Sequence, residues 1–267
     1  MSTSTDRRFA TTLARGLSVL RAFRPSDSGL TNAEISERTG LPKSTVSRLT
    51  FTLQALGYLT HAHHHDRYRP GPALLVLGNT AATSISFVDM AGPLMQRLAD
   101  ETGTLVLLLV RDHAKMLIVK TWRPRKVASL WLEAGHRLPF NGSSSGQTLL
   151  AALSPEAFAR VVEEADGDRD LTPERAAELR RETGGQLMKQ GFAIADPASY
   201  FASQIHAVAT SFQPKDLAEP VIFTCGAMPE MLSVDRMQQE VGPRLRATVG
   251  ELERMLGHAP GGPRGDL

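Results

Sequence analysis

Residues 30–57 read LTNAEISERTGLPKSTVSRLTFTLQALG, and this stretch decides the fold of the amino-terminal part of the chain. Thr31 stands three residues before Glu34, the spacing of a capping box, in which each side chain satisfies a free backbone amide at the start of a helix. A short helix is therefore predicted over residues 32–39. Gly40 then supplies the left-handed residue that ends it.

A second helix is predicted directly after this glycine turn, because Pro42 occupies a first-turn position and the apolar pattern continues to Gly57. The apolar residues at helical spacing predict one buried face, made of Val46, Leu49, Leu53 and Leu56. The opposite face is predicted to be exposed and carries Ser44, Ser47, Arg48 and Phe51. Two short helices joined in this way form a helix-turn-helix, whose second helix fits the major groove of DNA.

The exposed face of this second helix is predicted to contact DNA. Arg48 is the side chain that can fork onto a guanine or clamp a phosphate, Lys43 and Thr45 are placed to meet phosphates, and an exposed Phe51 needs a partner. The predicted DNA-binding residues are Thr31, Lys43, Ser44, Thr45, Ser47, Arg48, Phe51 and Arg67. The alternative is an ordinary buried helix pair, which would show the same apolar pattern.

The charge distribution favours DNA binding over that alternative. The chain of 267 residues has a formal charge of only +2, but residues 1–70 hold ten Arg and Lys against five Asp and Glu, whereas residues 71–267 hold 20 against 23. A helix over 11–23 and two short strands within 58–68 complete this small domain. His61 and His63–His65 are predicted to form a solvated wing turn near the DNA backbone rather than a metal site.

The rest of the chain predicts a larger α+β domain. A helix over 73–84 could connect the halves, and further helices are expected near 88–103, 147–153, 155–165, 173–190 and 234–256. Strands are expected at 104–110, 116–122, 127–132, 192–195, 205–212 and 221–227. The predicted division is a DNA-binding domain over 10–71, a linker helix over 72–86, a second domain over 87–258 and a disordered tail over 259–267.

Composition limits the kinds of site the protein can contain and its expected location in the cell. One cysteine, Cys225, excludes an intrachain disulfide and a cysteine-rich zinc site, and it is expected to be buried. No apolar run is long enough for a membrane helix, and the amino-terminal residues lack a signal-peptide core, so a cytoplasmic protein without membrane contact is expected. Trp122 and Trp131 are expected in the core. No cofactor or metal is predicted.

These residues carry a resemblance to a known family. The stretch 30–49, followed by Leu53, Leu56-Gly57 and Tyr68-Arg-Pro-Gly71, resembles the winged helix-turn-helix of the IclR family of bacterial transcriptional regulators, and Gly135 to Ala151 resembles a second element of that family. The resemblance implies a DNA-binding domain, a linker helix and a GAF-like effector-binding domain. It also implies homodimers or homotetramers that bind palindromic operator DNA and respond to a small organic acid or an aromatic effector.

The same resemblance implies that the loop from Pro139 to Gly146 lines the effector pocket, and backbone amides running into a helix start favour a carboxylate there. This chain departs from the family where Gln147 replaces a common Lys, His206 a Cys and Thr210 a Pro. The predicted effector-binding residues are Asn141, Gly142, Ser143, Ser145, Asp196 and His206. For His206, a hydrogen-bonded strand histidine is the alternative.

A rival hypothesis is a serine hydrolase, because Gly142-Ser-Ser-Ser-Gly146 matches the nucleophile-elbow pattern with Ser144 as nucleophile. An elbow requires a buried strand immediately before the turn, and residues 136–141 show no such strand pattern.

A second basic stretch, Arg111 to Lys126, is predicted to be a solvated face rather than a further DNA surface. The sequence therefore predicts a regulator rather than an enzyme: a repressor of a catabolic operon whose effector shifts a two-state dimer through the helix over 73–84.

Overall fold

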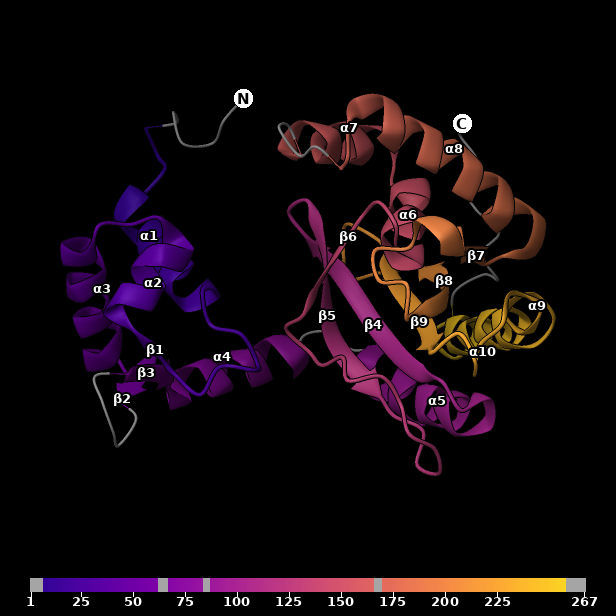
Figure 1. Ribbon diagram of the computed structural model, residues 1–267, viewed down its shortest axis with the longest axis horizontal. Coiled ribbons are helices and arrows are strands. Elements are labelled where there is room, and N and C mark those ends of the chain that lie inside the picture. Colours follow the sequence, from indigo (N-terminus) through magenta and orange to yellow (C-terminus); the bar gives the residue numbers. More distant parts are fainter. Residues whose placement is uncertain (1–6, 62–66, 84–86, 166–169, 258–267) are drawn as a thin grey trace. The chain divides into compact units, whose positions relative to one another are not determined.

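The computed structural model describes residues 7–61, 67–83, 87–165 and 170–257, which form two compact units, residues 1–85 and 86–267 (Figure 1). The histidines of the predicted wing turn, His63–His65, and the predicted disordered tail lie outside the described residues. In the described part of the chain, no helix is both long enough and apolar enough to cross a membrane.

The amino-terminal unit is a winged helix-turn-helix, as predicted. Its elements in chain order are α1 (Thr11–Arg21), β1 (Leu30–Thr31), α2 (Asn32–Thr39), α3 (Lys43–Ala55), β2 (Leu59–His61), β3 (Arg67–Pro70) and α4 (Pro72–Thr83). The three strands form an antiparallel sheet in the order β1-β3-β2, in which Tyr68 lies between Leu30 and His61. Strand β1 was not predicted, because two residues carry no periodic signal of their own.

The predicted capping box starts α2. The amide of Glu34 donates to Thr31 Oγ1 at 3.2 Å, and the amide of Thr31 donates to Glu34 Oε2 at 2.7 Å. Gly40 ends the helix with φ of 69°, the left-handed conformation that favours glycine. Helix α2 is therefore fixed at both ends by local interactions.

One small apolar core holds this unit together, and it contains Val19, Leu30, Ile35, Val46, Leu59 and Tyr68. Leu49 and Leu53 pack against it, as the apolar pattern of the second helix predicted. Leu56 does not, because it follows the last residue of α3 and is 61% exposed, so its predicted burial was wrong.

The second unit is an antiparallel sheet with helices, which confirms the predicted α+β class. Its sheet order is β6-β5-β4-β9-β8-β7. The strands are β4 (Leu105–Asp112), β5 (Lys115–Trp122), β6 (Arg137–Pro139), β7 (Ala193–Ile194), β8 (His206–Phe212) and β9 (Val221–Ala227). The helices are α5 (Phe87–Thr102), α6 (Ser144–Ala152), α7 (Pro155–Glu164), α8 (Pro173–Gln190), α9 (Val234–Arg236) and α10 (Gly242–Met255), with a short 3-10 helix over Pro197–Ser199 and a π-helical turn over Met237–Val241.

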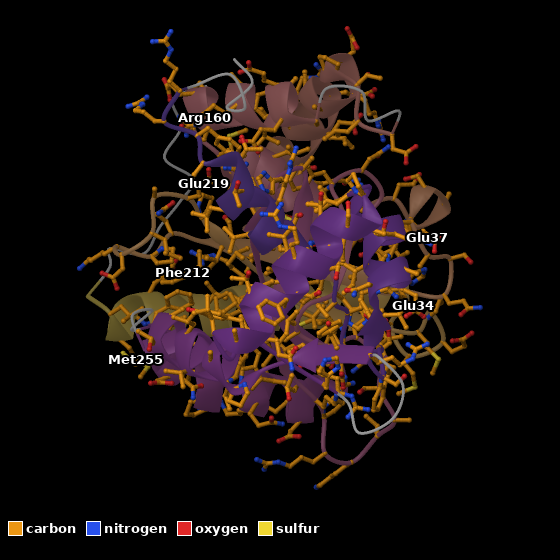
Figure 2. All side chains as sticks on the ribbon, turned by 90° about the vertical axis from the view of Figure 1, so that its left-hand side faces the viewer. Glu34, Glu37, Arg160, Phe212, Glu219 and Met255 are labelled. Atoms are coloured by element: carbon orange, nitrogen blue, oxygen red, sulfur yellow. The ribbon has the colours of Figure 1, made fainter. Side chains whose placement is uncertain are left out.

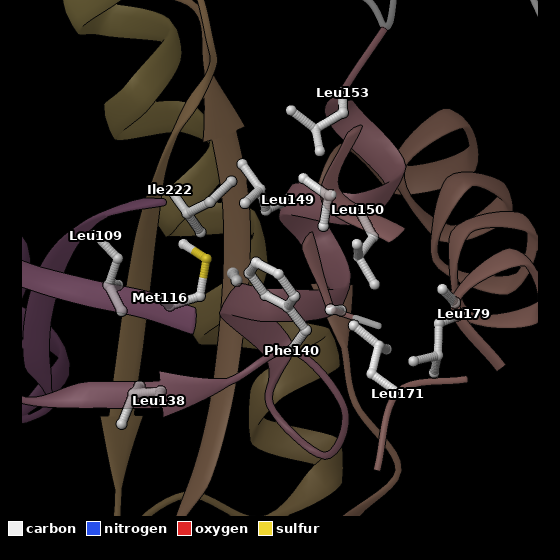
Figure 3. Close-up of a cluster of buried hydrophobic side chains, with 14 of the residues drawn as sticks. Leu109, Met116, Leu138, Phe140, Leu149, Leu150, Leu153, Leu171, Leu179 and Ile222 are labelled. Carbon is white, nitrogen blue, oxygen red and sulfur yellow. The ribbon is translucent and has the colours of Figure 1, made fainter. Parts of the chain in front are cut away.

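The two faces of this sheet are covered by different helices. On one face, Leu149 and Leu150 of α6 join Ile222 of β9 in a cluster that Phe140 also enters (Figure 3). On the other face, the ring of Phe87 at the start of α5 meets Phe212 of β8, which is labelled in Figure 2, at 5.0 Å between centroids. Because side chains alternate along a strand, each residue of β8 faces either α6 or the opposite side of the sheet, where α5 and α10 lie.

The predicted strand over 127–132 is not a strand. Its residues lie in a loop whose carbonyls bind the Arg123 guanidinium, which donates to Leu130 at 2.5 Å and to Leu132 at 2.7 Å. The edge strand is instead β6, which lies shortly before the serine loop (residues 141–145). Trp131 is 79% exposed beneath the same guanidinium, so its predicted place in the core was wrong, whereas Trp122 and Cys225 are buried as predicted.

Burial of Cys225 has an electrostatic consequence: desolvation raises the pKa of its thiol to about 12.

The basic stretch from Arg111 to Lys126, predicted to be a solvated face, is only partly exposed to solvent. Arg111 donates to both carboxylate oxygens of Glu219 at 2.7 Å and to Glu164, which ties β4 to α7 and to the segment before β9.

Close approach of two backbones positions the start of α6. A Cβ atom at Gly146 would lie 2.6 Å from the carbonyl oxygen of Phe140 and 2.7 Å from that of Pro139, closer than real Cβ atoms come. Gly185, in the middle of α8, is exposed and has no atom within 4 Å of such a Cβ. A Cβ atom would therefore clash at Gly146 but not at Gly185, and only the glycine at 146 is needed for the start of α6 to approach the end of β6.

We therefore expect opposite effects from two glycine-to-alanine substitutions. Gly146→Ala should lower the free energy of unfolding of the second unit by about 1–3 kcal/mol through overpacking. Gly185→Ala should raise it by about 0.5–1 kcal/mol, because alanine is the better helix former. Both tryptophans of the chain lie in this unit, so urea unfolding followed by tryptophan fluorescence measures both values. Equal effects of the two changes would contradict the close-approach argument.

Candidate DNA-binding and effector sites

The exposed face of α3 gathers most of the predicted DNA-binding residues. Lys43, Ser44, Ser47, Arg48 and Phe51 are exposed, and Thr45 is half-buried. Among the described residues, the side chains of Lys43 and Arg48 make no hydrogen bond or ion pair. Two cations and two hydroxyls are therefore available to an anionic partner along one side of the helix.

The side chains of Thr31 and Arg67 instead bond to other residues of the same unit. The Thr31 hydroxyl caps α2, and Arg67 donates to both oxygens of Glu34 at 3.1 Å and to the carbonyl of Gly29 at 2.7 Å (Figure 2 labels Glu34). Hydrogen bonds from the Thr31 backbone and hydroxyl, and then from Arg67, lower the pKa of Glu34. The structure does not bring these two residues to the exposed face of α3.

The second candidate site is the serine loop, residues 141–145, which leads into α6. Asn141 donates to the carbonyl of Asp170 at 2.8 Å, and Ser143 caps α6 by accepting the amide of Gly146 at 3.0 Å. The Ser145 hydroxyl lies 3.4 Å from that of Ser143, and both residues are buried. The loop thus points hydroxyl groups into the domain at the positive end of a helix.

Ser144 ties this loop to the sheet. Its hydroxyl donates to the carbonyl of Ala207 at 2.6 Å and accepts the amide of Ala195 at 3.0 Å. Ala195 directly precedes Asp196, so this bond brings the start of the 196–205 segment to the loop. Asp196 itself is exposed, and its carboxylate accepts the amide of Ala198 at 3.0 Å.

Tyr200 is a residue of this site that the sequence did not reveal. Its hydroxyl accepts the amide of Ser144 at 3.4 Å, and the next residue, Phe201, donates its amide to the carbonyl of Gly142 at 2.9 Å. Burial raises the pKa of the Tyr200 phenol. A neutral phenol oxygen therefore stands at the amino-terminal end of α6. The sequence feature that could have indicated Tyr200 is the aromatic pair Tyr200-Phe201 inside an otherwise polar stretch.

His206 lies apart from the serine loop. It is on the same face of β8 as Phe212, the face that α5 covers, whereas Ala209 faces α6. Its Nδ1 is 2.7 Å from the carbonyl oxygen of Leu232. This is the hydrogen-bonded strand histidine that the sequence left open as the alternative.

Two buried hydroxyls between α6 and the sheet have no partner in the described part of the chain, and neither was predicted. Thr148 follows Ser144 by one helical turn and so shares its sheet-facing side, while Thr224 pairs across the sheet with Ala209, which faces α6. A buried hydroxyl without a partner costs about 1–3 kcal/mol. These groups can bind a polar atom that enters this interface.

Comparisons with known proteins match both units. Residues 12–63 match the IclR helix-turn-helix domain, and residues 79–189 match the family described as bacterial transcriptional regulator IclR, C-terminal. An IclR-family transcriptional regulator from Brucella abortus, known from its crystal structure, is 31% identical, with a TM-score of 0.76 over 94% of this chain and 95% of that one. The chain belongs to the IclR family.

Further relatives of this IclR-family protein differ in extent. The transcriptional regulator TsaQ1/TsaQ2 of Comamonas testosteroni is 27% identical over 90% of this chain and 86% of its own length. The transcriptional repressor IclR of Escherichia coli is 25% identical over 56% of each chain. An IclR homologue from Microbacterium hydrocarbonoxydans, solved in complex with 4-hydroxybenzoate, is 23% identical, with a TM-score of 0.70 over 92% of this chain and 99% of that one.

These relatives are transcriptional regulators, which sets the hydrolase alternative aside: the IclR-family protein is not an enzyme. Strand β6 ends at Pro139, but it is a three-residue edge strand and not the buried strand that a nucleophile elbow requires. The proton of Ser144 is donated to the Ala207 carbonyl rather than to a base.

We therefore expect no reaction of Ser144 with a fluorophosphonate probe, because an activated nucleophile requires a neighbouring general base. Intact-protein mass spectrometry after incubation should show the unmodified mass, while a serine hydrolase in the same tube becomes labelled. Ser144→Ala should instead lower the free energy of unfolding by about 1–3 kcal/mol, since it removes the partner of two backbone groups. Stoichiometric labelling that Ser144→Ala abolishes would contradict this assignment.

Proposed function

We propose that this protein is an operator-binding repressor of a catabolic operon, and that a small organic acid or aromatic effector changes its affinity for DNA. The observation that carries the proposal is the exposed face of α3, where Arg48 and Lys43 lack protein partners in the described residues while other arginines of the same unit, Arg38 and Arg67, are paired. An unpaired arginine beside exposed hydroxyls on a recognition helix suits base edges and phosphates.

Each named residue has a separate role in the proposed DNA complex. Arg48 reads a guanine or clamps a phosphate, Ser44 and Ser47 make shorter polar contacts, and Lys43 and Thr45 face phosphates at the start of the helix. Thr31 acts indirectly by capping α2, and Arg67 by holding Glu34. The basic balance of residues 1–70 supports a salt-dependent contact with the DNA backbone.

The proposed effector site is the serine loop with the 196–205 segment. Asn141, Gly142, Ser143 and Ser145 come from the loop, Asp196 lies beside it through the Ala195–Ser144 bond, and Tyr200 closes it. His206, on the opposite face of the sheet, is left out. The positive end of α6 favours a carboxylate, and the 4-hydroxybenzoate complex of the Microbacterium homologue supports an aromatic acid as the first effector to test.

The repressor polarity follows the name of the Escherichia coli relative. We further propose a cytoplasmic homodimer or homotetramer that binds a palindromic operator, with residues 72–86 as the linker between residues 10–71 and 87–258. Helix α4 leaves Leu75, Val76 and Leu77 exposed, which suits a second copy of the chain. An effector acts on this assembly only if it binds the two DNA-affinity states unequally.

The first test is a gel shift with the DNA upstream of the gene and its neighbours, in a salt series with nonspecific competitor. The wild-type protein should bind one fragment specifically, and Arg48→Ala should weaken that binding by about five- to 150-fold, the loss of about 1–3 kcal/mol for one good base contact. Its free energy of unfolding should stay within about 0.5 kcal/mol of wild type, because Arg48 has no partner to lose.

Arg181→Ala is the matched control. Arg181 is an exposed arginine on α8 of the second unit, so this change removes the same charge without touching α3. It should leave the gel shift unchanged. Equal binding by wild type and Arg48→Ala would refute the assigned face.

The effector site predicts a separate phenotype. Ser145→Ala removes a buried hydroxyl but keeps the Ser143 cap, so it should weaken the release of operator DNA by 4-hydroxybenzoate about fivefold or more while operator affinity without effector is unchanged. Fluorescence anisotropy of labelled operator measures both quantities. Unchanged release by Ser145→Ala, where wild type responds, would remove Ser145 from the site. If 4-hydroxybenzoate does not act on wild type, the same titration is repeated with other small organic acids.

A further inference from the structure

Phe51 is the apolar exception on an otherwise polar recognition face. It lies on α3, three residues after Arg48 and four after Ser47, so it shares their side of the helix. Its side chain is 71% exposed, although α3 already packs Val46, Leu49 and Leu53 into the core. The fold of the unit gains nothing from a phenyl ring at this position.

A phenyl ring on a groove-facing helix has one apolar feature of DNA within reach. The C5 methyl group of thymine projects into the major groove, and apolar side chains contact it there. The neighbours of Phe51 favour DNA over a protein partner, because Arg48 on the same face is a cation without a described protein partner, and Ser47 is an exposed hydroxyl. An apolar protein surface would leave both groups desolvated and unpaired.

We propose that Phe51 is a specificity-determining residue that reads a thymine methyl group in each operator half-site. This inference rests on the proposed DNA-binding function. Arg48 and Phe51 are separated by about 4.5 Å along the helix axis, and successive base pairs are about 3.4 Å apart. The thymine should therefore lie one or two base pairs from the guanine that Arg48 contacts.

The test removes the methyl group alone. In the operator fragment defined by footprinting, each thymine of one half-site is replaced singly by deoxyuridine, which keeps base pairing and every hydrogen-bonding edge. One position should weaken wild-type binding about fourfold, the value for about 0.8 kcal/mol of buried methyl surface. Thymines outside both half-sites are the matched DNA control and should show no change.

Substitution of the protein then assigns the methyl contact to Phe51. Phe51→Ala should bind the thymine operator more weakly than wild type does. It should bind the thymine and deoxyuridine operators with equal affinity, so the fourfold penalty disappears. Phe51→Leu keeps an apolar side chain and should retain part of the penalty. Because Phe51 is exposed and outside the core, both variants should unfold at the same urea concentration as wild type.

Three results would overturn the inference, and they separate its failure from that of the proposed function. Specific operator binding that no deoxyuridine replacement weakens would exclude methyl readout. A penalty that persists in Phe51→Ala would assign the methyl group to another side chain. Absence of any specific DNA binding by the wild-type protein would refute the proposed function, and this inference with it.

Discussion

The carboxylate of Glu34 is the point on which the amino-terminal unit depends. It accepts the backbone amide and the hydroxyl of Thr31, and both of its oxygens accept the guanidinium of Arg67. One side chain therefore joins strand β1 and the start of α2, which are consecutive in the sequence, to strand β3, which follows more than thirty residues later. Glu34 thus fixes the start of α2, while the turn at Gly40 and the packing of Val46, Leu49 and Leu53 in the core direct the other face of α3 outward.

Several arginine side chains of this protein are bonded within the described part of the fold, whereas that of Arg48 is not. Arg38 bridges Asp27 and the end of α1, Arg111 bridges two glutamates, and Arg236 binds the carbonyl ending α5 and Glu240. Each of these side chains makes its hydrogen bonds or ion pairs within the protein. Arg48 makes no such bond with described residues, and it stands on the helix where a DNA partner is proposed. Arg15 and Arg181 also make no side-chain bond with described residues, so it is the place of Arg48 on the exposed face of α3 that singles it out.

The sequence predicted the features that local interactions determine. The Thr31–Glu34 spacing and Gly40 gave the helix-turn-helix, because caps and left-handed exits involve residues three or four apart. It failed where distant residues decide. Strand β1 exists only because β3, more than thirty residues later, pairs with it. The 127–132 segment is apolar enough for a strand, yet its carbonyls bind the guanidinium of Arg123. Similarly, Tyr200 entered the candidate site through a contact with Ser144, 56 residues away.

The bonding of the serine loop constrains how an effector could act there. The Ser144 hydroxyl donates to the carbonyl of Ala207 and the Ser143 hydroxyl to that of Pro139, so neither can donate to a ligand carboxylate without losing an existing bond. The amide of Ser144 is different, because its acceptor is a long contact to the phenol of Tyr200. A carboxylate would interact more strongly with this helix end than a neutral phenol does. A ligand that replaced the phenol would therefore have to displace the 196–205 segment, and the free-energy difference between the two arrangements would limit how far it could shift the protein between states.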